Sequence, residues 1–169
     1  GAKVAAQLNH SGKIAQEDTI AGRPIPVPSI PKSERSDMFS LLTQNEIMNF
    51  IKAGGPDGKG PRYHELTADE IKVEIQHFVD AAIRAKKANF DAVEIHAGHG
   101  YLISSFLSPA VNKRTDGYGG SVENRARLLV EIISAIKKEL TDEFPILVRL
   151  DANEYRIEGG IVPEDFLVT

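Results

Sequence analysis

Two stretches of the chain repeat hydrophobic residues at the spacing of an amphipathic helix. The first runs from about Ala68 to Ala88 and follows Thr67, with Glu70 three residues later, which is the pattern of a capping box. The second follows Ser121 and continues to about residue 140. Each stretch places its apolar side chains on one stripe, so we expect two long helices that each bury one face.

Three short apolar or alternating segments before, between and after these helices predict strands. They are Lys3–Leu8, Ala92–His96 and Ile146–Leu150. Pro163 indicates the first turn of a further helix, because proline is tolerated at that position. Strands and helices therefore alternate along the chain.

The connection from residue 9 to residue 66 is long for a compact domain. Only Thr43–Ala53 has helical spacing within it. The prolines predict an extended, partly polyproline path, and they stand at Pro24, Pro26, Pro28 and Pro31. Connections of this length are usually functional or disordered.

The alternation of strands and helices predicts an α/β fold with parallel strands and right-handed crossovers. A (β/α)8 TIM barrel and an open doubly wound sheet both have this order. The polar residues Gln7, His96 and Arg149 fall near the carboxyl ends of their strands, on the face opposite the apolar residues. A sheet covered on both sides is apolar throughout, whereas a barrel mouth carries polar groups at its strand ends. This pattern favours the barrel.

Three strands are fewer than half of a barrel, which takes about 250 residues. The chain begins at Gly1 without Met and stops at Thr169, directly after a helix start. We therefore expect residues 1–169 to be one partial TIM-barrel domain, truncated at both ends, with about strands 3 to 5 of the barrel.

Composition narrows the function classes. The 169 residues are 41% hydrophobic and 26% charged, which is typical of a globular domain. The net charge of -4 argues against nucleic-acid binding, which needs clustered basic residues. No apolar run reaches the roughly 18 residues of a membrane span. The absence of cysteine rules out Cys-based metal sites within these residues and fits a reducing compartment, so we expect a cytoplasmic protein.

The richest candidate chemistry lies where the second predicted strand ends. His96, His99 and Tyr101 fall within six residues. Two imidazoles can donate hydrogen bonds to one oxygen or anion, and a phenol can supply a proton to a strongly basic acceptor. The alternative is a pair of solvated loop histidines with a packed tyrosine. A metal site has little support, because the zincin pattern needs a helix and a Glu that follows the first His.

Two further polar strand residues have both a functional and a structural interpretation. Arg149 could stabilise an anion or an electron-rich cofactor, or it could form an ion pair with Glu94 or Asp151. Gln7 offers a donor and an acceptor together, which suits an amide or pyrimidine edge, or it could be a satisfied polar residue at a strand end.

The loop from Asn112 to Ser121 is dense in polar and turn residues. A solvated loop is its simplest interpretation, with Arg114 and Asp116 bracing it. Gly119-Gly120 resembles a phosphate-binding loop only faintly, because two glycines before a helix are a weak signal.

Several of these segments together resemble the Old Yellow Enzyme family of flavin-dependent oxidoreductases. The resemblance covers nearly the whole chain, and its motifs are long and in family order. The residues that carry it are Gln7-Leu8-Asn9-His10-Ser11-Gly12-Lys13, Val93-Glu94-Ile95-His96, His99-Gly100-Tyr101-Leu102, Phe106-Leu107-Ser108-Pro109, Asn112 through Arg125 and Val148-Arg149-Leu150.

The resemblance implies a (β/α)8 barrel that binds FMN at its carboxyl mouth. Gln7 would contact the flavin pyrimidine edge, and Arg149 would lie near the negative charge of the reduced flavin. His96 and His99 would bind the carbonyl oxygen, or another electron-withdrawing group, of a small-molecule substrate with an activated double bond. Tyr101 would protonate one carbon of that bond. NADH or NADPH would supply the electrons.

The resemblance is stronger to one branch of the family, the 2,4-dienoyl-CoA reductases and enoate reductases. Enzymes of that branch often continue into an iron–sulfur segment and a pyridine-nucleotide domain. An iron–sulfur cluster and FAD would therefore lie only in segments beyond Thr169, as would the site for the flavin phosphate.

Two alternatives from other classes stay open. The chain could be a half-barrel fragment that cannot bind FMN by itself, with exposed sheet edges that would permit a homo-oligomer. It could also belong to a metal-assisted barrel hydrolase that uses His96 and His99.

Overall fold

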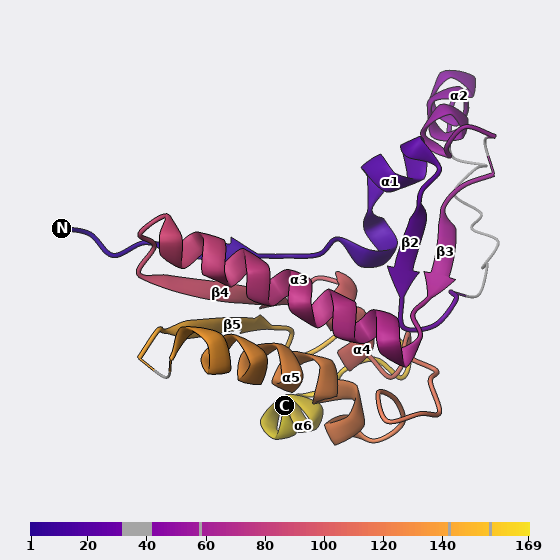
Figure 1. Ribbon diagram of the computed structural model, residues 1–169. Helices are drawn as coiled ribbons and strands as arrows, with labels where there is room; N and C mark the ends of the chain where they lie inside the picture. The colour runs from indigo at the N-terminus through magenta and orange to yellow at the C-terminus, as the bar shows by residue number, and fades with distance from the viewer. Residues whose placement is uncertain (32–41, 58, 142, 156) are drawn as a thin grey trace.

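Three parallel strands form the central layer of the molecule. They are β1 (Ala5–Leu8), β4 (Ala92–Ala97) and β5 (Ile146–Leu150), in the order β1-β4-β5. The computed structural model describes residues 1–31, 42–57, 59–141, 143–155 and 157–169 (Figure 1). The predicted strands and the predicted parallel α/β fold are confirmed.

Two long helices cover one face of this sheet and form its core. The helices α3 (Ala68–Lys87) and α5 (Val122–Leu140) lie side by side against it in Figure 1. Val93 and Ile95 of β4 are fully buried beneath them. We call β1, β4, β5, α3 and α5 the sheet layer.

Local sequence sets where the two helices begin. The Thr67 hydroxyl accepts a hydrogen bond from the Glu70 backbone N–H, and the Glu70 carboxylate accepts from the Thr67 N–H, so the predicted capping box is present. The Ser121 hydroxyl accepts from the backbone N–H of Asn124 at the start of α5. Both caps satisfy donors that a helix leaves unpaired.

The opposite face of the sheet is polar and open within the described residues. Gln7 of β1 and Leu147 and Arg149 of β5 are exposed there, while their sequence neighbours are half-buried. The alternation predicted from the sequence therefore holds, with an apolar face toward the helices and polar groups on the other side.

The long connection between β1 and α3 folds into a second, smaller unit, which was not predicted. It contains the 3-10 helix η1 (Gly12–Ile14), α1 (Gln16–Ala21), β2 (Pro24–Val27), α2 (Gln44–Ala53) and β3 (Arg62–Glu65). Figure 1 shows it beyond the carboxyl ends of the sheet strands. We call the described residues 12–31 and 42–65 the outer module.

Residues 24–27 are extended as expected, but they form a strand that pairs in parallel with β3 in a two-stranded sheet rather than a polyproline segment. Ile25 and Val27 alternate with prolines and are buried, which is the period of a strand. A strand with a free edge tolerates prolines, because their missing N–H costs no ladder bond there. The predicted helix at 43–53 is confirmed as α2, and residues 32–41 lie outside the described residues.

Two shorter helices complete the described structure. The segment after β4, expected to be a loop, contains α4 (Leu102–Leu107), whose residues are all buried. The helix predicted at Pro163 is present as α6 (Pro163–Val168). Within the described ranges, no helix combines the length and apolar character needed to cross a membrane.

Candidate functional site

The polar strand residues meet at one edge of the sheet because β1, β4 and β5 run parallel. His96 of β4 lies beside Arg149 of β5 in the strand register, and Gln7 of β1 lies beside Glu94 of β4. The carboxyl ends of parallel strands are the usual location of active sites in α/β folds. The structure thus brings together residues that are far apart in the sequence.

The three predicted residues of the strand-end loop form one ring cluster. The ring centroid of His96 lies 5.0 Å from that of His99 and 5.0 Å from that of Tyr101. Both pairs are edge-to-face, with interplanar angles of 84° and 80°. His96 is only 5% exposed, so it is not a solvated loop histidine, whereas His99 is exposed as the alternative interpretation expects.

His96 is held as a neutral imidazole of defined tautomer. Burial lowers its pKa below 6.5, and the nearby positive charges of His99 and Arg149 lower it further. The backbone N–H of Gly98 donates to His96 Nδ1 at 3.3 Å. The ring proton therefore sits on Nε2, which is left as a hydrogen-bond donor.

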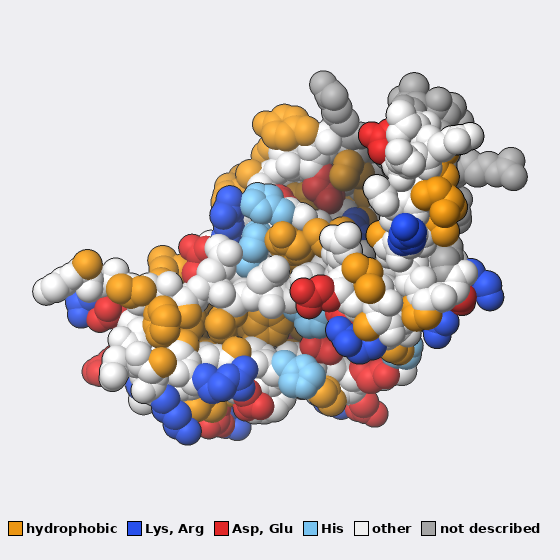
Figure 2. All heavy atoms as spheres, turned by 90° about the horizontal axis from the view of Figure 1, so that it is seen from above, with side chains coloured by type: hydrophobic (Ala, Val, Ile, Leu, Met, Phe, Trp, Pro, Cys, Tyr) orange, Lys and Arg blue, Asp and Glu red, His pale blue; other side chains and the backbone are white. Residues whose placement is uncertain are grey.

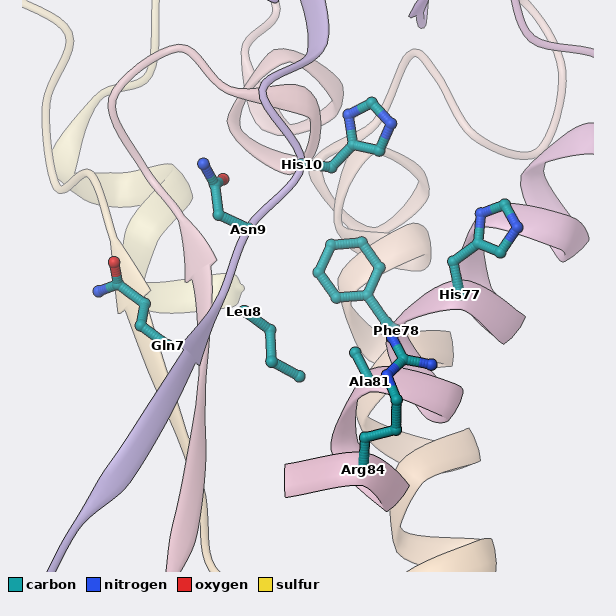
Figure 3. Close-up of a pocket in the computed structure, with 8 residues that line it drawn as sticks. All are labelled: Gln7, Leu8, Asn9, His10, His77, Phe78, Ala81 and Arg84. Atoms are coloured by element: carbon teal, nitrogen blue, oxygen red, sulfur yellow. The ribbon is translucent and has the colours of Figure 1, made fainter. Parts of the chain in front are cut away.

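Glu94 orients the amide of Gln7, a role that the sequence did not indicate. The Gln7 side-chain Nε2 donates to Glu94 Oε1 across the strand pair. This bond directs the NH2 group toward Glu94 and leaves the amide oxygen and a second N–H for another partner. Figure 3 shows Gln7 pointing to the side of β1 opposite Leu8, which faces α3.

Arg149 is an exposed cation on the polar face. The alternative interpretation, an ion pair of Arg149 with Glu94 or Asp151, is not realised, and all three residues are described in the structure. Its guanidinium has no carboxylate partner among the described residues, so on the open sheet face it can interact with an anionic or electron-rich group.

Asp151 and Ser104 were missed as site residues and support the loop that carries His99. Asp151 accepts a hydrogen bond from the backbone N–H of His99 at 2.6 Å. Ser104, at the start of α4, donates to the same carboxylate. The sequence indicates Asp151 only as an ion-pair partner of Arg149, because the pattern of one sequence does not show which backbone N–H a carboxylate binds.

Three cavities near this edge of the sheet are each lined by one of the predicted residues. One of about 330 Å³ lies between the end of β1 and α3 and is lined in part by Gln7 (Figure 3). Another of about 380 Å³ borders His99, and a third of about 380 Å³ borders Tyr101. Figure 2 shows histidine side chains beside hydrophobic ones on the face seen from above. The candidate site is thus an open surface rather than a closed pocket.

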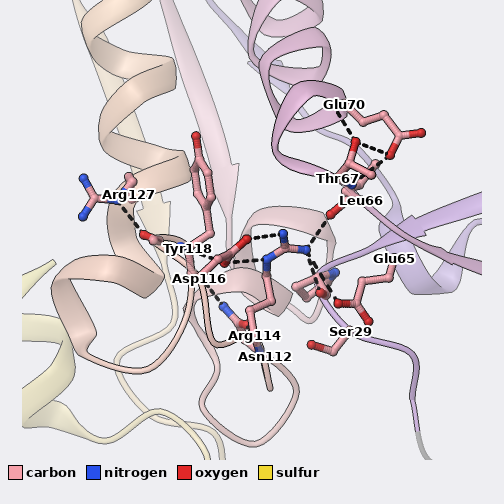
Figure 4. Close-up of polar contacts among 12 residues, drawn as sticks. Ser29, Glu65, Leu66, Thr67, Glu70, Asn112, Arg114, Asp116, Tyr118 and Arg127 are labelled. Atoms are coloured by element: carbon pink, nitrogen blue, oxygen red, sulfur yellow. Dashed lines mark hydrogen bonds and ion pairs between the residues drawn. The ribbon is translucent and has the colours of Figure 1, made fainter.

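The predicted brace of the loop by Arg114 and Asp116 is present, and Arg114 also reaches other segments. Its guanidinium forms a two-bond pair with Asp116 and donates to the backbone oxygens of Pro28 and Leu66 (Figure 4). A Cβ on Gly119 would lie 2.3 Å from the backbone oxygen of Arg114, so this glycine serves close packing. The faint phosphate-loop interpretation of Gly119-Gly120 gains no support.

The metal interpretation of the histidines lacks a set of ligands. Across the described ranges, no three His, Cys, Asp or Glu side chains are grouped so that they could hold a metal ion. The carboxylate of Asp151 already accepts hydrogen bonds from a backbone N–H and from a hydroxyl group.

The chain is similar to known proteins in family, sequence and structure. The model of the NADH:flavin oxidoreductase / NADH oxidase family matches residues 1–168. An NADPH dehydrogenase of Clostridium acetobutylicum is 41% identical over 167 residues, which are 99% of this chain and 42% of that protein.

Solved structures give the same result at the level of the fold. The 2-naphthoyl-CoA reductase in complex with 2-naphthoyl-CoA has a TM-score of 0.77 and 32% identity, over 99% of this chain and 24% of its own. Old Yellow Enzyme from Pichia sp. AKU4542 has a TM-score of 0.70 and 32% identity, over 89% of this chain and 36% of its own. The chain therefore spans less than half of the length of these relatives.

Proposed function

The chain belongs to the NADH:flavin oxidoreductase / NADH oxidase family, and we propose that its full-length protein is an FMN-dependent ene-reductase. The proposed reaction reduces the activated C=C bond of a small enone or enoyl thioester, with NADH or NADPH as the electron donor. One observation carries the proposal. His96, His99 and Tyr101 form a single ring cluster at the strand edge that also presents Arg149.

The residues of the polar face fit the ring system of FMN. Gln7, held by Glu94, keeps an acceptor and a donor free, which match the carbonyl and N–H groups of a flavin pyrimidine edge. Arg149 offers an exposed cation for the negative charge of the reduced flavin. When bound, FMN supplies the hydride chemistry of the reaction.

The two histidines would bind and polarise the substrate oxygen. His96 has its proton on Nε2, so as a neutral ring it can donate to a carbonyl oxygen. A second donor from His99 would meet the same oxygen, because the two rings are packed edge to face. Such donors stabilise negative charge that develops on the oxygen in the transition state.

Tyr101 would complete the reduction by giving its phenolic proton to the carbon that becomes basic. Its ring contacts His96, so it lies next to the group that holds the substrate oxygen. A phenol is a weak acid, which suits donation of its proton to a strongly basic carbanion. The double bond would gain one hydride and one proton in total.

We further propose that residues 1–169 form about strands 3 to 5 of a (β/α)8 barrel, as one partial FMN-binding domain. The supporting observations are three adjacent parallel strands, helices on one face and polar strand ends on the other. A relation to 2,4-dienoyl-CoA and enoate reductases, a cytoplasmic location, and an iron–sulfur cluster or FAD beyond Thr169 stay predictions.

The direct test uses the full-length protein reconstituted with FMN. NADPH and NADH oxidation should be stimulated by 2-cyclohexenone or by crotonyl-CoA. Replacement of Tyr101 by Phe should slow turnover by about 10²-fold or more, while flavin reduction by the nicotinamide is retained. If neither substrate is reduced, the proposal fails. If Tyr101→Phe turns over as fast as the parent, Tyr101 is not the proton donor.

A second candidate is favoured by the open sheet. β1 and β5 each have a free edge among the described residues. The 169-residue chain by itself would then be unable to bind FMN. Titration of this chain with FMN distinguishes the two cases, because tight stoichiometric quenching of flavin fluorescence would overturn the second candidate.

A further inference from the structure

The carboxylate of Asp151 reaches from the end of β5 into the loop that follows β4. Its Oδ2 accepts the backbone N–H of His99 at 2.6 Å and the hydroxyl of Ser104 at 3.1 Å. These two donors come from a segment about fifty residues earlier in the chain, as the separations of 52 and 47 residues show. Asp151 therefore ties two neighbouring strand ends together.

The same carboxylate packs directly against the backbone of the loop. A Cβ on Gly98 would lie 2.8 Å from Asp151 Oδ1, which is closer than non-bonded atoms can approach. The backbone N–H of Gly100 donates to the Ser104 hydroxyl at 3.1 Å. A continuous chain of hydrogen bonds thus runs from Gly100 through Ser104 to Asp151 and on to His99.

The loop needs this support because His99 has a strained backbone. Its φ is 60°, in the left-handed region that residues with a Cβ rarely adopt. Such a conformation is strained, and it persists only where the surroundings determine it. A charge-assisted hydrogen bond to the N–H of this residue is a direct means of holding it.

We propose that Asp151 is a positioning residue that fixes the backbone of His99 so that the imidazoles of His99 and His96 converge on one substrate oxygen. This inference rests on the proposed function. Asp151 touches no reacting atom in this scheme. It acts through the peptide N–H of His99 and through Ser104, and it forms no ion pair with the nearby Arg149, although both residues lie within the described structure.

Asp91 provides a matched control at the other end of the sheet. Its carboxylate also accepts one backbone N–H, from Val4 at 2.9 Å, and one side-chain donor, from Lys3 at 2.6 Å. Asp91 precedes β4, whereas Asp151 follows β5. Loss of either carboxylate removes similar bonds, but only Asp151 contacts the histidine loop.

The test compares Asp151→Ala, Asp151→Asn and Asp91→Ala in the full-length FMN-loaded protein. The first readout is the dissociation constant of cyclohexanone, a saturated ketone that offers the oxygen without a reducible double bond, followed by the change in flavin absorbance. We expect Asp151→Ala to weaken binding about tenfold, which corresponds to about 1.4 kcal/mol. Asp151→Asn keeps an acceptor oxygen and should recover most of the affinity. Asp91→Ala should bind like the parent.

The second readout is independent of the reaction. In protein labelled with ¹⁵N-histidine, the amide proton of His99 should resonate downfield in the parent and move upfield in Asp151→Ala. Unchanged ketone binding in Asp151→Ala, equal loss in Asp91→Ala, or an unmoved His99 resonance would each overturn the inference. Failure of the parent to reduce any enone would instead overturn the proposed function, while the amide resonance would still report on Asp151.

Discussion

The sheet layer and the outer module differ in what holds them together. Buried residues of β4, α3, α4 and α5 form one continuous apolar cluster. Among the described residues of the outer module, the apolar cluster consists of Ala15, Ile25 and Val27, with Tyr63 packed against it. Apolar burial contributes roughly 25 cal/mol per Å², so the sheet layer carries most of the hydrophobic stabilisation.

Hydrogen bonds attach the outer module to the rest of the chain, where its own apolar core is small. Arg114, whose side chain is only 7% exposed, donates to the backbone oxygens of Pro28 and Leu66 at the junction of the two regions. Ser29 also accepts the backbone N–H of Lys113. A region with a small core can therefore be placed accurately by a few directional bonds, although it gains less stability from them.

Two isoleucines test this difference most directly, because Ile95 in the sheet layer and Ile25 in the outer module are both fully buried. Ile95→Ala should lower the free energy of unfolding of the full-length protein by about 3 kcal/mol, through lost burial and a cavity. Ile25→Ala should lower it by less than half as much, because the outer module can loosen locally. Denaturant titration measures both values. Equal losses would show that the two regions share one cooperative core.

Removal of the Arg114 guanidinium should weaken the attachment of the outer module to the sheet layer. Arg114→Met keeps an apolar stem but leaves two backbone oxygens without their donor, and we expect a cost of about 2 kcal/mol. The change should appear as faster hydrogen exchange at the amides of β2 and β3, while those of β4 stay protected. Arg127→Met is the control, because Arg127 bonds only to Gly117 and Asn124 within the described residues of the loop and helix. If both variants exchange alike, Arg114 is not the attachment.

The two capping boxes allow a smaller comparison of the same kind. Thr67 caps α3 of the sheet layer and Thr43 caps α2 of the outer module, each with a Glu three residues later. Thr67→Ala should cost about 1 kcal/mol of global stability. Thr43→Ala should fray α2 with little change in the global unfolding midpoint. A larger midpoint shift for Thr43→Ala would contradict the division.

Acid should affect the sheet layer before it affects the Arg114 attachment of the outer module, with the smallest effects of the set. The pKa of His96 is lowered below 6.5, chiefly by burial, so its neutral form stabilises the fold and that stability is lost as pH falls from about 6.5 through the folded pKa. The pKa of Asp116 is lowered below 3.8, first by its hydrogen bond from Arg114, so that contribution survives until pH falls below about 3.8. The histidine effect should therefore come first.

Unfolding midpoints measured between pH 7 and pH 3 check this order. In His96→Gln the loss of stability below pH 6.5 should be reduced, whereas Asp116→Asn should alter only the more acidic part of the curve. A curve for His96→Gln that matches the parent above pH 4 would remove His96 from this role.

The sheet layer was predictable because its helices and strands each bury one face. The stripe that includes Ile71 and the alternation of Val93 and Ile95 are local signals of burial, and the caps at Thr67 and Ser121 are local signals of helix starts. By contrast, α4 is buried on all sides, so it has no stripe to reveal it. β2 was not predicted as a strand because prolines occupy alternate positions in it.

The residue types of the candidate site could be predicted from the sequence. The residues that orient them were harder to predict. Gln7, His96 and Arg149 could be placed together because parallel strands end at one edge. The roles of Glu94 and Asp151 depend on contacts across strands, whose exact register one sequence does not contain. The functions assigned to the predicted residues stay proposals until the variants are measured.

The strand order also has a consequence for synthesis of the protein. β4 lies between β1 and β5, so β1 cannot pair with β4 until the chain has been made as far as Ala97. At about 5–20 residues per second, β1 waits for this partner on the order of ten seconds after it emerges. The outer module and α3 are made during that interval, and Arg149 of β5 is the last strand residue of the candidate site to join its neighbour.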